Sequence, residues 1–150
     1  MVGVTRRGKA TKIMAVADRH GLPIACGIAS GQRHEAKLVV DTLKARFVDE
    51  LPRRLIGDKA YDGDKAYDSN KLDAELAAMG VDMISPNHST RLHQTQDRRK
   101  LPRYKRRWLI ERVLAWLMRS RRLVTRYEHH AQNFLGFVQL ACAVVLLRRL

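Results

Sequence analysis

Residues 53–72, RRLIGDKAYDGDKAYDSNKL, carry the hexapeptide GDKAYD twice in direct succession. The apolar pair Leu55-Ile56 stands shortly before the first aspartate and predicts a short buried strand. Asp58 would then lie at the carboxyl end of that strand, where open α/β sheets place their functional side chains. Asp64, the same position in the second copy, is the alternative that the repeat leaves open.

Strands and helices alternate on both sides of this stretch. The expected elements are a hairpin over 11–18 and 24–31, a helix over 35–46, a helix over 71–79, a strand over 81–85, a long helix over 103–122 and a helix over 131–148. Residues 88–102 are polar, basic and without periodicity, which indicates a loop. This order predicts one α/β domain over residues 1–150, with a mixed sheet, flanking helices and an all-helical C-terminus.

The chain is strongly basic. Its formal net charge is +14 over 150 residues, and between positions 98 and 126 twelve of 29 residues are Lys or Arg. This density indicates a polyanionic partner, of which nucleic acid is the first candidate and an anionic membrane surface the second. No run of 18 apolar residues occurs in the sequence and no apolar leader follows Met1, so we expect a cytoplasmic protein without a membrane partner.

Four residues that are often functional are interpreted here as packing residues. Cys26 and Cys142 each lie inside an apolar segment, and disulfides are rare in the cytosol, so both are expected to be reduced and buried. Trp108 and Trp116 are eight positions apart with leucines and a valine nearby, which favours core packing over a role in stacking bases.

Glu111 is the single acidic residue between positions 98 and 126. On the expected helix it lies one turn after Arg107, and the simple interpretation is an exposed ion pair worth roughly 0.2–0.5 kcal/mol. The alternative is a carboxylate that binds a divalent metal, with the flanking cations binding phosphates. Two carboxylates on separate elements, here Asp58 and Glu111, are a ligand set of the kind that Mg²⁺ phosphoryl-transfer sites use.

Four segments, taken together, resemble one known family. LIGDKAYD (55–62), YKRRWLIERVLAWLMRSRRLVTRYE (104–128) and NFLGFVQLACAVVLLRRL (133–150) resemble the C-terminal part of bacterial insertion-sequence DDE transposases of the IS-four and IS-five type. TKIMAVADRHGLPIACGIASGQRHEA (11–36) is similar to the segment immediately upstream in that family. The resemblance implies an RNase H-like fold and a transposase that hydrolyses and transfers DNA strands at transposon ends.

The resemblance implies three catalytic carboxylates that bind two Mg²⁺ ions, for which Mn²⁺ substitutes. The second aspartate belongs to the family's (A/G)DKAYDS motif, and Asp58 inherits its strand-end position directly after Leu55-Ile56-Gly57. Asp64 has the better match on its C-terminal side, but only the poorer apolar run of the first repeat precedes it. We therefore predict Asp58 and Glu111 as catalytic and metal-binding residues.

The glutamate of the family belongs to a Tyr-x2-Arg-x3-Glu-x6-Lys signature. Tyr104, Arg107 and Glu111 match it in type and spacing, whereas Met118 stands at the lysine position and Arg119 follows one place later. Neighbouring helical residues point about 100° apart, so the contact of Arg119 with DNA is left open. The residues expected to bind DNA are Tyr104, Arg107, Arg119 and Arg122.

The family's first catalytic aspartate lies on a strand upstream of the 11–18 hairpin. By the resemblance, residues 1–150 are an N-terminally truncated catalytic domain that lacks this first strand, which belongs mid-sheet between the hairpin and the Asp58 strand. Asp18 is interpreted as a turn residue and not as a substitute for the missing aspartate. The expected partners are transposon terminal inverted repeats and target DNA, and either a second copy of the chain or the product of an upstream reading frame.

A second function is compatible with the same residues. If the first carboxylate is missing, the isolated chain is impaired in catalysis and acts as a DNA-binding transposase remnant, or as a competitor of the full-length transposase. Its basic segment would still bind phosphates with a steep salt dependence. Cleavage with a divalent metal distinguishes the two functions.

Overall fold

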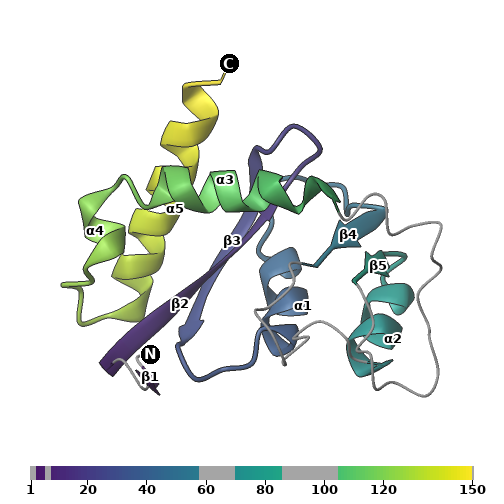
Figure 1. The fold of residues 1–150 in the computed structure, drawn as a ribbon, viewed down its shortest axis with the longest axis horizontal. Coiled ribbons are helices and arrows are strands. Elements are labelled where there is room, and N and C mark those ends of the chain that lie inside the picture. The colour runs from purple at the N-terminus through teal and green to yellow at the C-terminus, as the bar shows by residue number, and fades with distance from the viewer. Residues whose placement is uncertain (1–2, 6–7, 58–69, 86–104, 150) are drawn as a thin grey trace.

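The computed structural model describes residues 3–5, 8–57, 70–85 and 105–149, and it has an α/β architecture (Figure 1). The strands are β1 (Gly3–Thr5), β2 (Gly8–Ala17), β3 (Pro23–Ser30), β4 (Arg54–Ile56) and β5 (Asp82–Ile84). The helices are α1 (Ala36–Lys44), α2 (Asn70–Ala78), α3 (Trp108–Leu117), α4 (Arg121–Val124) and α5 (Ala131–Leu147). Within the described ranges every element after position 105 is helical, which confirms the predicted all-helical C-terminus.

The predicted hairpin is formed by β2 and β3, and Asp18 closes its turn. The Asp18 Oδ1 atom accepts hydrogen bonds from the backbone N–H groups of His20 and Leu22, both at 2.8 Å. Gly21 has a φ of 78°, a left-handed value that a residue without Cβ adopts at no steric cost. Asp18 is therefore a turn residue, as predicted.

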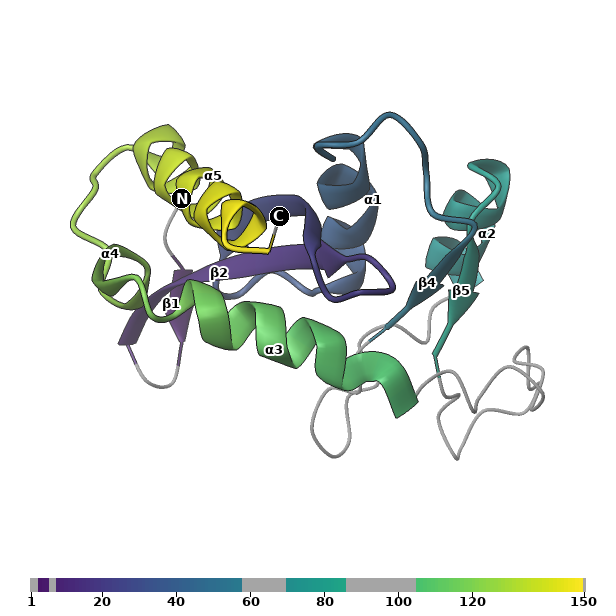
Figure 2. The ribbon, with the colours of Figure 1, turned by 90° about the horizontal axis from the view of Figure 1, so that it is seen from above.

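Among the described residues the strands form two sheets, and the single mixed sheet that we predicted is not seen there. β1, β2 and β3 make an antiparallel sheet in that order, whereas β4 and β5 pair in parallel, with Leu55 opposite Met83. A largely apolar cavity of about 210 Å³ lies between β2 and β4, and Ala15, Val16 and Leu55 are among its lining residues. Figure 2 shows the second sheet and α2 at the end of the molecule opposite α4. We call the cavity between β2 and β4 the inter-sheet cavity.

Helices cover the hairpin and create two hydrophobic cores. Ala25 and Cys26 are neighbours on β3 and both are buried, but they belong to different cores because adjacent strand residues point to opposite faces. Cys26 packs in the core built by α3, α4 and α5, whose largest buried side chain is Phe134. Ala25 packs in the core of α1 and α2, which includes Leu43 and Leu76. The hairpin therefore lies between the two cores, and each of its faces packs in one of them.

Cys26 and Cys142 are buried free thiols, as predicted. The two side chains, from β3 and α5, belong to the same core and are close enough to hydrogen-bond. That hydrogen bond and burial both raise the pKa of the Cys142 thiol. Because the thiolate is the reactive form of cysteine, Cys142 acts as a packing residue.

The predicted helix over 103–122 is interrupted, and this prediction was wrong at its C-terminal end. α3 ends at Leu117, Ser120 is extended with φ −82° and ψ 109°, and α4 starts after it. Leu117 and Leu123 are both buried in the core around α5. On an unbroken helix these two side chains would point about 120° apart, so the interruption allows both to reach the same core. Arg122 therefore lies on α4, whereas Glu111 lies on α3.

The remaining predicted helices are present with boundaries close to those expected. α2 is followed by Gly80, whose φ of 74° is typical of the glycine that stops a helix. α5 covers 17 residues and buries Phe134 and Val138 against the hairpin and α3. Among the helices of the described ranges, none combines the length and the apolar character that crossing a bilayer requires.

Candidate functional site

Glu111 lies on the first full turn of α3 and forms the predicted ion pair with Arg107. The Arg107 Nε atom is 3.3 Å from Glu111 Oε1, and the two side chains are 45% and 53% exposed. An exposed pair of this kind stabilises the fold by only about 0.2–0.5 kcal/mol. The Glu111 carboxylate is exposed, so it can bind a ligand while it is paired with Arg107.

The start of α3 lies beside the end of β4. Arg107 and Ile110 line the inter-sheet cavity together with Ile56 of β4 and with Asp18 at the hairpin turn. A smaller adjoining cavity is lined by Gly57 and Ile110, among other residues. The backbone position directly before Asp58 therefore lies near the turn of α3 that carries Glu111.

Three of the predicted site residues, Asp58, Asp64 and Tyr104, lie outside the described residues. In the part of the chain that the structure describes, no group of three or more His, Cys, Asp or Glu side chains gathers as metal ligands would. The Glu111 carboxylate is a hard oxygen donor of the kind that Mg²⁺ prefers. On its own it does not make a metal site, so the described residues supply one candidate ligand.

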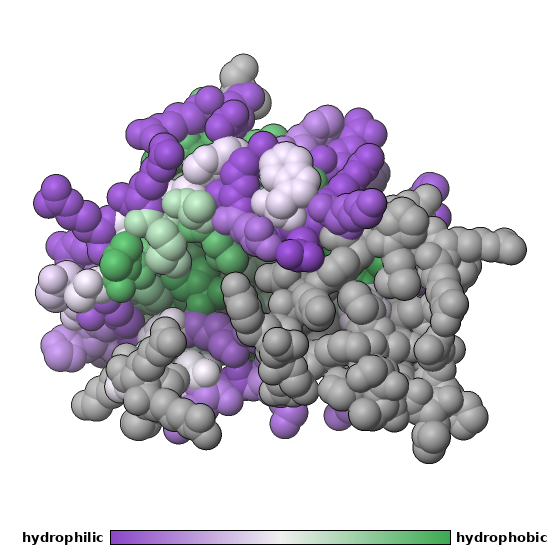
Figure 3. Space-filling view, in the orientation of Figure 1, coloured by the Kyte–Doolittle hydropathy of each residue, from purple (hydrophilic) through white to green (hydrophobic). Residues whose placement is uncertain are grey.

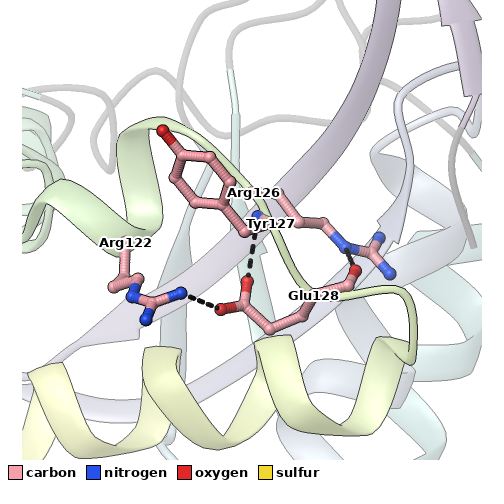
Figure 4. Close-up of polar contacts among 4 residues, drawn as sticks. All are labelled: Arg122, Arg126, Tyr127 and Glu128. Atoms are coloured by element: carbon pink, nitrogen blue, oxygen red, sulfur yellow. Dashed lines mark hydrogen bonds and ion pairs between the residues drawn. The ribbon is translucent and has the colours of Figure 1, made fainter.

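Arg122, predicted to bind DNA, is part of a network at the connection between α4 and α5 (Figure 4). Its Nη1 atom is 3.2 Å from Oε1 of Glu128, whose side chain is only 8% exposed. The other carboxylate oxygen of Glu128 accepts the Tyr127 backbone N–H at 3.2 Å. Arg122 thus has a structural partner, and its contact with DNA stays a prediction.

Arg126 is a residue of the basic segment for which the sequence suggested no individual role. Its guanidinium donates to the Glu128 backbone carbonyl at 2.8 Å and to the Thr11 hydroxyl of β2, also at 2.8 Å. It also lies 5.3 Å from the centroid of the Phe134 ring. Arg126 therefore attaches the α4–α5 connection to the hairpin, and part of the basic segment serves the fold.

Arg112 fixes α3 to the hairpin turn. Its guanidinium lies 4.8 Å from the ring centroids of both Trp108 and Trp116, and its Nη2 atom donates to the His20 carbonyl at 2.7 Å. A Cβ atom at Gly21 would contact the same nitrogen, and the left-handed φ of 78° independently favours glycine at that turn position. Trp108 is 50% exposed, so the prediction that it packs in the core was wrong. Its ring stacks on the Arg112 guanidinium instead.

We expect Arg112→Gln to lower the free energy of unfolding by about 2 kcal/mol, because it removes a charged hydrogen bond and two cation–π contacts. Urea denaturation followed by circular dichroism measures the loss. Arg119→Gln makes the same change at an exposed position and should alter stability by less than about 0.5 kcal/mol. Equal unfolding free energies for Arg112→Gln and the unmodified chain would contradict this structural role.

The surface around α3 is basic. Residues 105–149 contain ten Lys or Arg but only two acidic residues, Glu111 and Glu128. Figure 3 shows hydrophilic side chains over the upper and central part of this face, with a hydrophobic patch on the side of α4 and α5. Glu128 is largely buried against Arg122, which leaves Glu111 as the exposed carboxylate among these cations.

Comparison with known proteins identifies the family. Residues 5–146 match the family model of the transposase DDE domain. The chain belongs to this family. It is also similar to a putative transposase for insertion sequence element IS6501 of Brucella ovis, with 33% identity over 141 residues that cover 92% of this chain and 98% of that relative. No solved structure matches.

Membership of the DDE transposase domain confirms the coarse part of the resemblance described above. The similarity to an insertion-sequence transposase extends over nearly the whole chain, including α3 with Arg107 and Glu111. The IS-four and IS-five subfamily, and the position of these residues within a longer transposase, stay predictions. So do the functional roles of all the predicted site residues, which are Asp58, Tyr104, Arg107, Glu111, Arg119 and Arg122.

Proposed function

We propose that this transposase domain cleaves and joins DNA at the ends of an insertion element. The observation that carries the proposal is the exposed carboxylate of Glu111 on α3, a helix that follows the basic run 105–107 and whose first turn borders the end of β4. Asp58 follows that strand end by two positions in the sequence. Both carboxylates would then face DNA that the surrounding arginines attract.

Mg²⁺, or Mn²⁺ in its place, is the proposed cofactor, with Asp58 and Glu111 as its ligands. The ion supplies the charge that activates a water molecule and stabilises the leaving oxygen of a phosphodiester. Arg107 is proposed to orient the Glu111 carboxylate through its 3.3 Å contact and to bind the scissile phosphate. Tyr104, Arg119 and Arg122 are the further side chains proposed to bind DNA.

The two sheets are proposed to be parts of one RNase H-like sheet that a further strand completes. The inter-sheet cavity supports this, since its walls are the apolar residues Val16, Leu55 and Ile56 of two facing strands. Within the described residues β4 pairs with β5 alone, so its second edge is available to an extended segment. That segment would carry the first catalytic carboxylate, and the product of an upstream reading frame or a second copy of the chain are its proposed sources.

The test is cleavage of the element's own terminal repeats, with target DNA present, in Mg²⁺ or Mn²⁺. The chain is assayed alone and together with the upstream-frame product. Glu111→Gln should reduce nicking at least about a hundredfold, since it removes a metal ligand. Glu75→Gln is the matched control, because Glu75 also pairs with a cation one turn earlier, Lys71 at 4.0 Å, but on α2.

Binding without cleavage in every combination of chain, partner and metal would contradict the catalytic proposal. The chain would then be a DNA-binding transposase remnant or a competitor of the full-length transposase. Loss of nicking in both Glu111→Gln and Glu75→Gln would also count against a specific role for Glu111. A nicking activity that needs no divalent metal would exclude the proposed chemistry.

A further inference from the structure

Another cavity, of about 380 Å³, lies between the ends of α3 and α5, away from the inter-sheet cavity. Arg119 and Ser120 line it from the turn after α3, and Arg148 and Arg149 line it from the end of α5. In Figure 1, α5 passes behind α3, and the last turns of α5 emerge beyond α3. The Trp116 ring also lines the cavity. We call this space the arginine cavity.

Three guanidinium groups line the arginine cavity, and no described residue brings a carboxylate to it. None of its lining residues is acidic. In the described part of the chain, no ion pair involves Arg119, Arg148 or Arg149. Like charges that converge in one cavity repel each other, and a bound anion removes that repulsion. The cavity is therefore complementary to a negatively charged ligand.

The helix dipole explains only part of this arrangement. Arg148 and Arg149 directly follow α5, where the negative end of the helix favours cations. That preference does not account for Arg119, which reaches the same cavity from the end of the other helix. Arg149 already lies over the Trp116 ring, 4.3 Å from its centroid, so this ring face is occupied. A ligand bound through its charge fits the cavity better than a stacked base.

We propose that the arginine cavity binds a backbone phosphate of the DNA that flanks the cleavage position. This inference rests on the proposed function, because it takes DNA as the ligand. Arginine presents a planar fork of donors that matches the oxygens of a phosphate, and the Ser120 hydroxyl adds a donor. The contact is with the backbone and so does not depend on base sequence.

The length of α3 sets the distance between the two proposed phosphate contacts. Arg119 lies twelve positions after Arg107. The ten residues of α3 rise about 15 Å, at about 1.5 Å per residue, and the two side chains start just beyond its two ends. Since B-DNA rises about 3.4 Å per base pair, this span corresponds to about five base pairs. On a duplex that runs parallel to α3, the phosphate in the arginine cavity would therefore lie about five base pairs from the one at Arg107.

The experiment compares two duplexes from the element's end, one that includes this flank and one that stops short of it. The Arg119→Gln/Arg148→Gln double variant is expected to bind the long duplex about tenfold more weakly, with the slope of log K against log salt reduced by about 1. Its affinity for the short duplex should equal that of the unmodified chain. Arg33→Gln/Lys44→Gln removes the same charge at exposed positions on and before α1 and is the matched control.

Each outcome is decisive. A loss confined to the long duplex and absent from the control supports the inference. An unchanged affinity and slope in the double variant would overturn it while leaving the proposed function intact, and so would an equal loss in the control. If the unmodified chain binds neither duplex, both this inference and the proposed function fail. Thermal melting checks the fold, which we expect to be unchanged because Arg119 and Arg148 are exposed.

Discussion

Asp58→Asn is expected to reduce metal-dependent cleavage of the element's end by about a thousandfold, whereas Asp64→Asn leaves it nearly unchanged. The reason is the strand that precedes the repeat: β4 ends at Ile56, and the buried Gly57 donates its N–H to the Ile84 carbonyl at 3.0 Å. Gly57 lines the same small cavity as Ile110 of α3, which supports the role proposed for the aspartate that follows it in the sequence. Loss of a metal ligand would remove stabilisation of the transition state. Single-turnover cleavage with the complete set of partners measures both variants.

The tandem repeat makes this comparison unusually well matched. Both aspartates stand in the same hexapeptide, GDKAYD, so the two variants change the same residue in the same local sequence. If Asp64→Asn were the inactive variant, the second copy would supply the catalytic aspartate. If both variants cleaved as fast as the unmodified chain, neither aspartate would belong to the site. In either case the assignment of Asp58 would be wrong.

Phe134→Ala should destabilise the fold more than any surface change considered above. The ring is 2% exposed in the core that α3, α4 and α5 build on the hairpin, and the Arg126 guanidinium lies over it. Removing a buried ring leaves a cavity, and such substitutions cost about 3–5 kcal/mol. Urea denaturation should therefore show a much lower midpoint for this variant.

Leu140→Ala is the control for this prediction. Leu140 lies on the same helix, but its side chain is 60% exposed, so the change should cost less than about 0.5 kcal/mol. Similar losses at Phe134 and Leu140 would mean that the exposed face of α5 is covered in solution. A small loss at Phe134 would contradict the core described here.

Local signals in the sequence predicted much of the fold. The hairpin, the turn at Asp18 and the end of α2 before Gly80 depend on residues within a few positions, so pattern and turn chemistry sufficed. The Arg107–Glu111 pair was predictable because residues four apart share a helix face. The acidic residue of the candidate site could therefore be identified from helical spacing and from the family motif.

Contacts between distant segments could not be predicted in this way. The interruption after Leu117 exists because Leu123 packs in the same core, a constraint imposed by α5. Arg126 and Arg112 looked like members of one basic surface, yet each binds the hairpin, more than ninety positions away. The arginine cavity likewise forms only when the end of α5 meets the end of α3.

The placement of Arg112 has a practical consequence. The chain contains two tryptophans, Trp108 and Trp116, and both stack on this arginine. The tryptophan emission of the chain therefore arises from one helix, the one that Arg112 holds to the hairpin turn. A shift of the tryptophan emission maximum would report the undocking of α3 from the hairpin turn. The same signal offers a label-free readout of any ligand that settles on this helix.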